Sequence, residues 1–242
     1  MGTKNAATVT QNVYTTALHK YLSPETLKHV ANFADDFLVG ADSIPELLQI
    51  FEEFLNMCKQ ARITLNPKKV RFGFTSEQFY GYTISGGKIT PSEKNLEPLR
   101  KMEYPKSRKG LRSVMGVFNQ FKSFIHNYSR EGSPSRVLNS LLSTKKPWTG
   151  ITQIHKKCID TLKQTILKGL HLYTPRDDLP LELETDASND GWGAVLFQTI
   201  INNGKKERHV IKMWSGQWPK SYVKKPPYYK EAKGWMNAME LT

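Results

Sequence analysis

Residues 32–40 read NFADDFLVG and set two adjacent carboxylates, Asp35 and Asp36, between apolar runs. The β-branched and aromatic residues on both sides are typical of strands, and Asp is common in turns. Successive side chains of a strand point to opposite faces, so only a turn presents both carboxylates to one site. We therefore predict a β-hairpin whose turn contains Asp35 and Asp36. The pair is either a site for a hard cation such as Mg²⁺ or a solvated turn.

The charge of the whole chain predicts a polyanionic partner. Its 242 residues include 35 Lys and Arg against 22 Asp and Glu, which gives a formal net charge of +13 and a pI near 9.6. Nucleic acid is favoured over a membrane surface, because no basic amphipathic helix stands apart from the rest.

The remaining composition argues against disulfides, zinc and membrane spans. Cys58 and Cys158 lie far apart on apolar helical patterns and have no second ligand at metal-binding spacing, so we expect buried thiols. No apolar run approaches the roughly 18 residues that a membrane span needs, and the N-terminus lacks a signal-peptide core. We expect an intracellular protein with no membrane association.

The periodicity along the chain predicts alternating helical and strand regions. Residues 42–61 contain a clear amphipathic helical pattern that opens with Ser43 as a capping residue, and Pro24 interrupts an earlier helical stretch. Residues 63–74 and 78–90 alternate like short strands, the second with a turn at Gly86 and Gly87. Between Arg100 and Arg136 the chain is basic, with nine Lys or Arg against two Glu.

One apolar stripe in this basic region predicts a single long helix. Its members recur at helical spacing: Leu111, Val114, Met115, Phe118, Phe121, Ile125 and Tyr128. Beyond Pro180 the pattern changes to three strands followed by a helix, which indicates a second, α/β unit.

The order of the motifs around the acidic pair resembles the reverse transcriptases of long-terminal-repeat retroelements, most closely the gypsy type. FADDFLVGAD is similar to the family's catalytic hairpin, and LNPKK, FYGYTIS and the basic helical block follow in the family's order. The resemblance implies that Asp35 and Asp36 hold the catalytic Mg²⁺, with Mn²⁺ as the alternative metal. It begins and ends inside the family's domains, so we expect a segment truncated at both ends.

Three further motifs acquire roles from the resemblance. The opening GTKNAATVTQ is similar to the segment near the incoming nucleotide and template, which implies this role for Gly2, Lys4 and Asn5; a helix N-terminus without substrate contact is the alternative. Lys69, with Lys68 as second choice, matches a lysine near the leaving pyrophosphate, or is only a solvated charge. FYGYTIS resembles the primer grip, whose residues would be Phe79, Tyr80, Gly81 and Tyr82, although these aromatic side chains could equally pack within a hairpin.

A second acidic cluster lies in LETDASNDGWGAVLFQ. Asp186 could open an EF-hand loop, but position twelve of such a loop needs Glu and here is Phe197. The stretch resembles the first strand of ribonuclease H, and YYKEAKGWMNA resembles its first helix. The resemblance therefore assigns metal binding and catalysis to Asp186 and Glu231, while Asp190 is a turn residue.

These resemblances imply an α+β chain: the C-terminal part of a polymerase palm and a helical thumb, followed by a partial ribonuclease H-like α/β domain. The expected domains are a palm with the primer-grip hairpin at 1–90, a thumb at 91–145, a connection at 146–180 and ribonuclease H at 181–242. The implied activities are Mg²⁺-dependent nucleotidyl transfer and hydrolysis of RNA/DNA hybrids.

The implied partners are primer-template, RNA/DNA hybrid and deoxynucleoside triphosphates, in a cytoplasmic particle or the nucleus. Both sites need further carboxylates, so we expect an enzyme by family but no efficient turnover by this chain alone. The alternative is a nucleic-acid-binding remnant without catalysis. The oligomeric state is left open.

Overall fold

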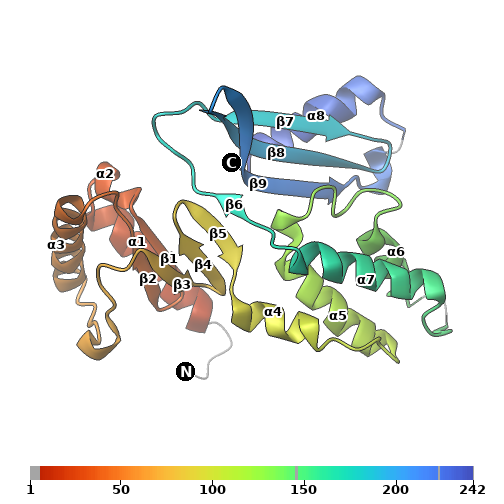
Figure 1. Ribbon diagram of the computed structural model, residues 1–242, viewed down its shortest axis with the longest axis horizontal. Helices are drawn as coiled ribbons and strands as arrows, with labels where there is room; N and C mark the ends of the chain where they lie inside the picture. Colours follow the sequence, from red (N-terminus) through yellow and green to blue (C-terminus); the bar gives the residue numbers. More distant parts are fainter. Residues whose placement is uncertain (1–5, 145–146, 223, 242) are drawn as a thin grey trace. The chain divides into compact units, whose positions relative to one another are not determined.

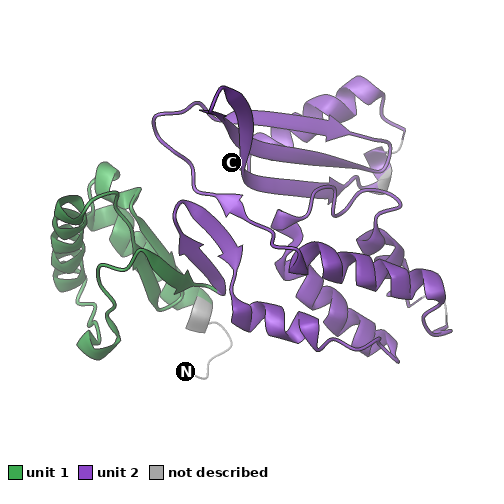
Figure 2. Cartoon of the chain, in the orientation of Figure 1, with its two compact units in different colours: residues 1–80 green, residues 81–242 purple. Residues whose placement is uncertain are grey.

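The computed structural model describes residues 6–144, 147–222 and 224–241. The chain divides into two compact units, residues 1–80 and residues 81–242 (Figure 2). Each unit contains its own cluster of buried apolar side chains. Within the described residues, no helix combines the length and the hydropathy that crossing a membrane requires.

The first unit contains three helices: α1 (Ala6–Tyr21), α2 (Pro24–Leu27) and α3 (Ile44–Gln60). Pro24 interrupts the helical stretch as predicted, because it occupies the first position of α2, where proline needs no N–H partner. Ser43 caps α3 by accepting a hydrogen bond from the Glu46 amide. The apolar stripe of α3 is thereby directed into the core of this unit, where Phe54 and Met57 are buried.

A two-stranded hairpin lies against these helices. It consists of β1 (Val30–Phe33) and β2 (Asp36–Val39), paired antiparallel from Val30–Val39 to Phe33–Asp36. Val30, Phe37 and Val39 belong to one face of the hairpin and pack on the core formed with α1 and α3. The predicted hairpin around NFADDFLVG is confirmed.

The predicted strand over residues 63–74 is wrong. This region contains only a short 3₁₀ helix, η1 (Pro67–Lys69), and the next strand is β3 (Ser76–Phe79). The Oδ1 atom of Asn66 accepts a hydrogen bond from the Lys68 amide at 3.1 Å, and Pro67 follows it at the first helical position. This local capping competes with strand pairing. The alternation of apolar and polar residues did not reveal it.

The second unit begins with a small antiparallel sheet of β4 (Tyr82–Ser85), β5 (Lys88–Pro91) and β6 (Leu172–Tyr173). Ser85 pairs with Lys88, so the loop between β4 and β5 has two residues, Gly86 and Gly87. Both have positive φ, 55° and 69°, which is the conformation that a tight hairpin turn of this kind requires. The predicted glycine turn is therefore confirmed.

A helical layer follows this sheet and contains the core of the second unit. The helices are α4 (Glu93–Arg100), α5 (Arg108–Gln120), α6 (Pro134–Ser140) and α7 (Gln153–Leu167), with the 3₁₀ turn η2 (Lys122–Phe124) after α5. Leu111 and Phe118 of α5 are fully buried, and Ile159 and Ile166 of α7 pack in the same cluster. Trp148 packs against it as well.

The prediction of one long helix over 111–128 is wrong, although the whole stripe is buried. Helix α5 ends at Gln120. Phe121 reaches the core from just before η2, and Ile125 and Tyr128 reach it from the segment after η2. The Gln120 carbonyl accepts a hydrogen bond from the Tyr82 hydroxyl at 3.0 Å, while the Phe124 amide donates to the Phe121 carbonyl. A tertiary contact thus replaces the next helical hydrogen bond.

The C-terminal part is a three-stranded antiparallel sheet covered by one helix. The strands are β7 (Glu182–Ala187), β8 (Gly191–Asn202) and β9 (Lys205–Gln217), in the order β7–β8–β9, and the short 3₁₀ helix η3 (Lys220–Tyr222) precedes α8 (Pro227–Met239). Figure 1 shows α8 behind the sheet. The predicted three strands and helix are confirmed, as is the α+β class. The boundaries at 90, 145 and 180 remain predictions.

Candidate functional site

The first acidic pair lies at the tip of the β1–β2 hairpin. Phe33 pairs with Asp36, so the connecting loop has only two residues, Ala34 and Asp35. The prediction that the turn contains both carboxylates is therefore wrong in one detail: Asp35 lies in the turn, but Asp36 is the first residue of β2. Both side chains are exposed. Because Asp35 and Asp36 are adjacent in the chain, both carboxylates still lie at the same end of the hairpin.

The two faces of the hairpin differ in their surroundings. Asp36 shares a face with its cross-strand partner Phe33 and with Ala31, and all three are exposed. The opposite face packs on the helices through Val30 and Phe37. The hairpin thus has a buried face that holds it in position and an open face that presents Asp36.

Gln11 of α1 holds the hairpin tip and was missed by the sequence analysis. The Ala34 amide donates to Oε1 of Gln11 at 2.7 Å, and Nε2 of Gln11 donates to Oδ1 of Asn32 at 3.0 Å. Ala34 has a φ of 52°, a left-handed conformation that costs energy for a residue other than glycine. Only the packing of α1 on the hairpin reveals this anchor, since Gln11 lies 23 positions before Ala34.

One predicted primer-grip residue lies beside the acidic hairpin. The ring of Tyr80 contacts the ring of Phe33, with 3.7 Å between centroids. Because Phe33 is the cross-strand partner of Asp36, the structure brings Tyr80 to the open face of the hairpin. Phe79 ends β3 and is half-buried.

The other two primer-grip residues belong to the second unit. The Gly81 carbonyl accepts a hydrogen bond from Nδ2 of Asn95 at 2.9 Å. The Tyr82 ring stacks on Phe124, with 5.5 Å between centroids, and its hydroxyl donates to the Gln120 carbonyl. Tyr82 therefore attaches β4 to the end of α5.

The predicted nucleotide-side residues are less informative. Gly2, Lys4 and Asn5 lie outside the described residues. Lys69 and Lys68 are exposed in η1, and neither ammonium group forms an ion pair with a carboxylate in the described part of the chain. Their proposed role near pyrophosphate stays a prediction.

The second predicted site is divided between β7 and α8. Asp186 is exposed on β7 and pairs with Gly193. Glu231 is exposed in the first turns of α8, next to the buried Lys230, whose Nζ donates to Oδ1 of Asn189 at 3.0 Å. Helix α8 packs closely on β7 and β8 through Gly234. The shared catalytic role of the two carboxylates remains a prediction.

The structure also argues against the EF-hand calcium loop that Asp186 could open. Phe197, at the twelfth position of that hypothetical loop, is buried in β8. The Ser188 hydroxyl forms hydrogen bonds with the Gly191 amide and carbonyl, at 3.2 Å each. The turn before β8 therefore satisfies its own polar groups.

The segment between η2 and α6 contacts the sheet beside Asp186, and sequence analysis missed this. The Ser129 amide donates to the Ser215 hydroxyl of β9 at 3.1 Å. The carboxyl groups of Glu131 and Asp190 share a hydrogen bond, which raises the pKa of Glu131, and their like charges add to the shift. No local pattern signals these contacts, because the partners lie far apart in sequence.

The donor chemistry at both acidic sites suits a hard divalent cation, which prefers carboxylate oxygens. Among the described residues, however, no three His, Cys, Asp or Glu side chains come together as a metal site. Asp35 with Asp36, and Asp186 with Glu231, would each contribute at most two of the carboxylates that a two-metal site needs.

Two protein families match this chain. The family model described as reverse transcriptase (RNA-dependent DNA polymerase) matches residues 1–84. The model of the RNase H-like domain found in reverse transcriptase matches residues 151–241. The chain belongs to the reverse transcriptases. Divalent metals are the general cofactors of both families.

The polyproteins of transposons Tf2-3 and Tf2-7 of Schizosaccharomyces pombe are similar to this reverse transcriptase chain. They are 32% and 31% identical to it over 170 residues, which is 70% of the chain. The aligned region spans 12% of the length of each polyprotein. The predicted relation to gypsy-type retrotransposon polyproteins, with reverse transcriptase and ribonuclease H-like domains, is confirmed.

Solved structures have the same fold. A foamy viral protease-reverse transcriptase in complex with dsDNA matches with a TM-score of 0.72 and 19% identity. The match covers 100% of the present chain and 48% of the viral chain. The same viral protein in complex with an RNA/DNA hybrid matches with a TM-score of 0.67 and 20% identity. This match covers 89% of the present chain and 29% of the viral chain. The predicted palm, thumb and ribonuclease H fold is confirmed at this level.

Proposed function

We propose that this chain is the part of a retroelement reverse transcriptase that holds the primer end and begins the ribonuclease H domain. Its reactions would be template-directed extension of a DNA primer and hydrolysis of the RNA strand of a hybrid. The acidic hairpin is the observation that carries the proposal. Gln11 of α1 accepts a hydrogen bond from the Ala34 amide at the hairpin tip, and the face that presents Asp36 is exposed.

The residues of the first site have separable roles in this proposal. Asp35 and Asp36 would hold a divalent cation, Mg²⁺ or Mn²⁺, with further carboxylates from outside the described residues. Tyr80, beside Phe33 on the open face, would support the primer terminus. Lys69 would neutralise negative charge on the leaving pyrophosphate. Bound cations would activate the attacking hydroxyl and stabilise the leaving group.

In the second site, Asp186 and Glu231 would hold the cations for attack by water on the RNA strand. Asp186 lies on a paired strand, and rigid elements hold catalytic carboxylates more accurately than loops do. Each site has two predicted carboxylates within the described residues. We therefore expect the isolated chain to bind metal weakly and to turn over poorly.

The proposed partner is nucleic acid, with deoxynucleoside triphosphates as substrates of the first site. The net charge of +13 favours phosphate binding irrespective of sequence. The foamy viral relatives, which share the fold, were solved with dsDNA and with an RNA/DNA hybrid. The site of action would be a cytoplasmic particle or the nucleus.

Primer extension tests the proposal. The purified chain, incubated with primer-template, deoxynucleoside triphosphates and Mg²⁺, should bind the primer-template in a salt-dependent manner and extend it at most slowly. Asp35→Asn and Asp36→Asn should abolish any extension, whereas Asp42→Asn, which removes an acidic group outside the hairpin, should not. Extension that survives both hairpin substitutions would refute the assignment of the site.

A non-catalytic nucleic-acid-binding remnant is the second candidate. It is favoured by the absence of any three-ligand metal cluster among the described residues. It predicts that affinity for an RNA/DNA hybrid is the same in Mg²⁺ and in EDTA, and that Asp35→Asn combined with Asp186→Asn leaves it unchanged. A Mg²⁺-dependent difference at either position would favour the catalytic candidate.

A further inference from the structure

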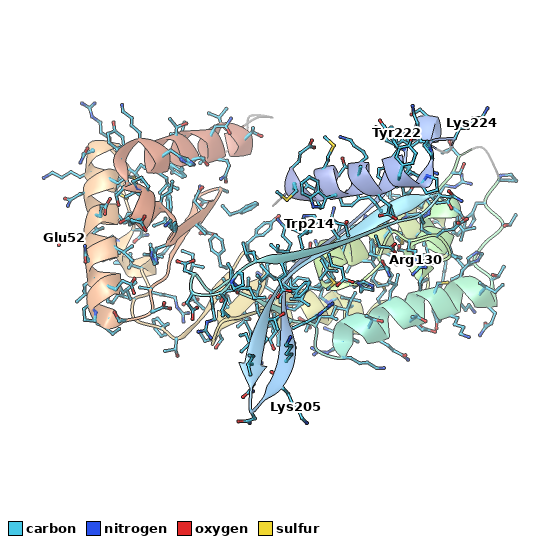
Figure 3. The ribbon with its side chains drawn as sticks, turned by 90° about the horizontal axis from the view of Figure 1, so that it is seen from above. Glu52, Arg130, Lys205, Trp214, Tyr222 and Lys224 are labelled. Carbon is cyan, nitrogen blue, oxygen red and sulfur yellow. The ribbon has the colours of Figure 1, made fainter. Side chains whose placement is uncertain are left out.

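Arg130 and Asp186 line the same narrow pocket at the edge of the C-terminal sheet. The pocket has a volume of about 20 Å³ and is also lined by Asn127, Ser188 and Ser215. This space suits one water molecule or one phosphate oxygen but excludes a base or a sugar ring. Arg130 is labelled in Figure 3, among side chains that lie between α8 and α7 in that view.

The backbone, and not its own side chain, holds Arg130 at this pocket. Its amide donates to the Asn127 carbonyl at 3.0 Å in a turn where Asn127 has a φ of 55°. On either side, the Ser129 amide is bonded to Ser215 and the Glu131 carboxyl to Asp190. Asn127 lies against the sheet at Gly193, where an added β-carbon would be 3.4 Å from Oδ1 of Asn127. The residue before Arg130 is thus attached to the sheet that carries Asp186, and the residue after it to the turn between β7 and β8.

Among the residues that the structure describes, none pairs with the guanidinium group of Arg130. Within the described residues it forms no ion pair or hydrogen bond, although Asp186 lines the same pocket. Two other exposed arginines of this unit do form ion pairs: Arg176 with Asp178 at 2.6 Å and Arg208 with Glu184 at 2.7 Å. Arg130 therefore presents five unused N–H donors beside a carboxylate.

We propose that Arg130 binds a non-bridging phosphate oxygen of the nucleic-acid strand that Asp186 engages, so that the segment before α6 supplies part of the ribonuclease H-like site. The guanidinium fork fits phosphate oxygens with two parallel hydrogen bonds, and such charge-assisted bonds are stronger than neutral ones. The positive charge offsets repulsion between the Asp186 carboxylate and the phosphate. This inference rests on the proposed ribonuclease H function.

Binding of an RNA/DNA hybrid by the full chain in Mg²⁺ tests the inference. Arg130→Ala should weaken binding roughly tenfold, the effect of losing one good charged hydrogen bond. It should also reduce the slope of log affinity against log salt by about one. Arg130→Lys, which keeps the charge but loses the fork, should recover part of the affinity.

Lys168→Ala is the matched control, because Lys168 is an exposed cation after α7 outside the pocket. It should change affinity less than about twofold. The Arg130→Ala variant should melt like the wild type, since the side chain has no hydrogen-bond or ion-pair partner in the described part of the chain. If Arg130→Ala melts at a lower temperature than the wild type, the binding measurement is made with Arg130→Gln, which keeps most of the side-chain length.

The outcomes separate the two proposals. If Arg130→Ala and Lys168→Ala bind the hybrid equally well, the inference about Arg130 is overturned and nucleic-acid binding stands. If the wild type fails to bind the hybrid at any salt concentration, the proposed function and the inference fall together. A selective loss with Arg130→Ala, partly restored by Arg130→Lys, supports the direct contact.

Discussion

At the scale of single residues, the first site depends on a strained backbone position. Ala34 adopts a φ of 52° between Phe33 and the acidic pair, and the Gln11 side chain holds its amide at 2.7 Å. A conformation of this kind persists only where the surrounding structure fixes it. Together, the two-residue turn and Gln11 set the direction of Asp35.

The strain at Ala34 predicts a position-specific cost for β-branched residues. Ala34→Val should lower the free energy of unfolding of the first unit by about 1–2 kcal/mol, because valine tolerates positive φ poorly. Ala31→Val is the matched control: Ala31 is exposed within β1, where valine suits a strand. Urea denaturation measures both, and equal effects at the two positions would contradict the strain argument.

The Glu131–Asp190 contact predicts a pH-dependent attachment of the segment before α6. The pKa of Glu131 is raised in the folded chain, first by the hydrogen bond with Asp190. The folded state therefore binds this proton more tightly than the unfolded state does. The contact is fully present below the unfolded pKa of Glu131 and is lost as pH rises through the folded pKa.

Amide hydrogen exchange tests this expectation. Protection of the Ser129 amide, which donates to Ser215, should decrease as pH rises from acidic toward neutral, after correction for intrinsic exchange rates. Glu131→Gln keeps a donor for Asp190 but does not titrate, so its protection should vary less with pH. A wild-type profile that matches the Gln variant would rule out the proposed proton-sharing contact.

At the scale of elements, close packing of α8 on the sheet depends on Gly234. A β-carbon there would lie 3.5 Å from Cβ of Trp192 and 3.8 Å from Cβ of Ala187, which is ordinary van der Waals contact. The interface thus has room for a methyl group but for little more. The position of α8 matters for function, because this helix carries Glu231.

Two substitutions at Gly234 should have effects of opposite sign. Gly234→Ala should raise the free energy of unfolding by about 0.5–1 kcal/mol, since alanine favours the helix and its methyl group fits. Gly234→Leu should lower it by about 1–3 kcal/mol through overpacking. In α5, Gly116 has no atom within 4 Å of an added β-carbon, so both changes should be tolerated there. Chemical denaturation measures all four variants, and a stabilising Gly234→Leu would contradict this packing.

Element prediction from sequence succeeded where local signals agree and failed where a distant group intervened. The β4–β5 turn was predicted because two adjacent glycines satisfy its backbone requirement without help. The length of α5 was not predicted, because the helix ends where the Tyr82 hydroxyl donates a hydrogen bond to the Gln120 carbonyl. Tyr82 lies 38 residues away, and helical periodicity carries no information on so distant a contact. Local capping by Asn66 likewise replaced a predicted strand with η1.

At the scale of the whole molecule, the chain has two separate apolar cores. Phe54 of α3 is 2% exposed in the core of the first unit, and Phe118 of α5 is 0% exposed in the core of the second. Neither cluster includes a residue of the other unit. The two units are therefore expected to have separable stabilities.

Core truncations should reveal this separation. Phe54→Ala and Phe118→Ala should each cost about 3–5 kcal/mol in the unit that contains the residue. Native-state hydrogen exchange, followed separately for α3 and α5, measures the two stabilities. Each substitution should reduce protection mainly in its own unit. Equal loss of protection in both helices with either variant would show one cooperative core.

The sequence by itself determined the hairpin around Asp35 and Asp36, the three C-terminal strands and their helix, the basic character and the family. These follow from turn preference, side-chain periodicity and motif order, which depend on neighbouring residues. Only the tertiary structure decided that Asp36 belongs to a strand, that Gln11 anchors the hairpin, and that Arg130 shares a pocket with Asp186. These features arise from contacts between distant residues, and such contacts exist only after the helices and sheets have packed together.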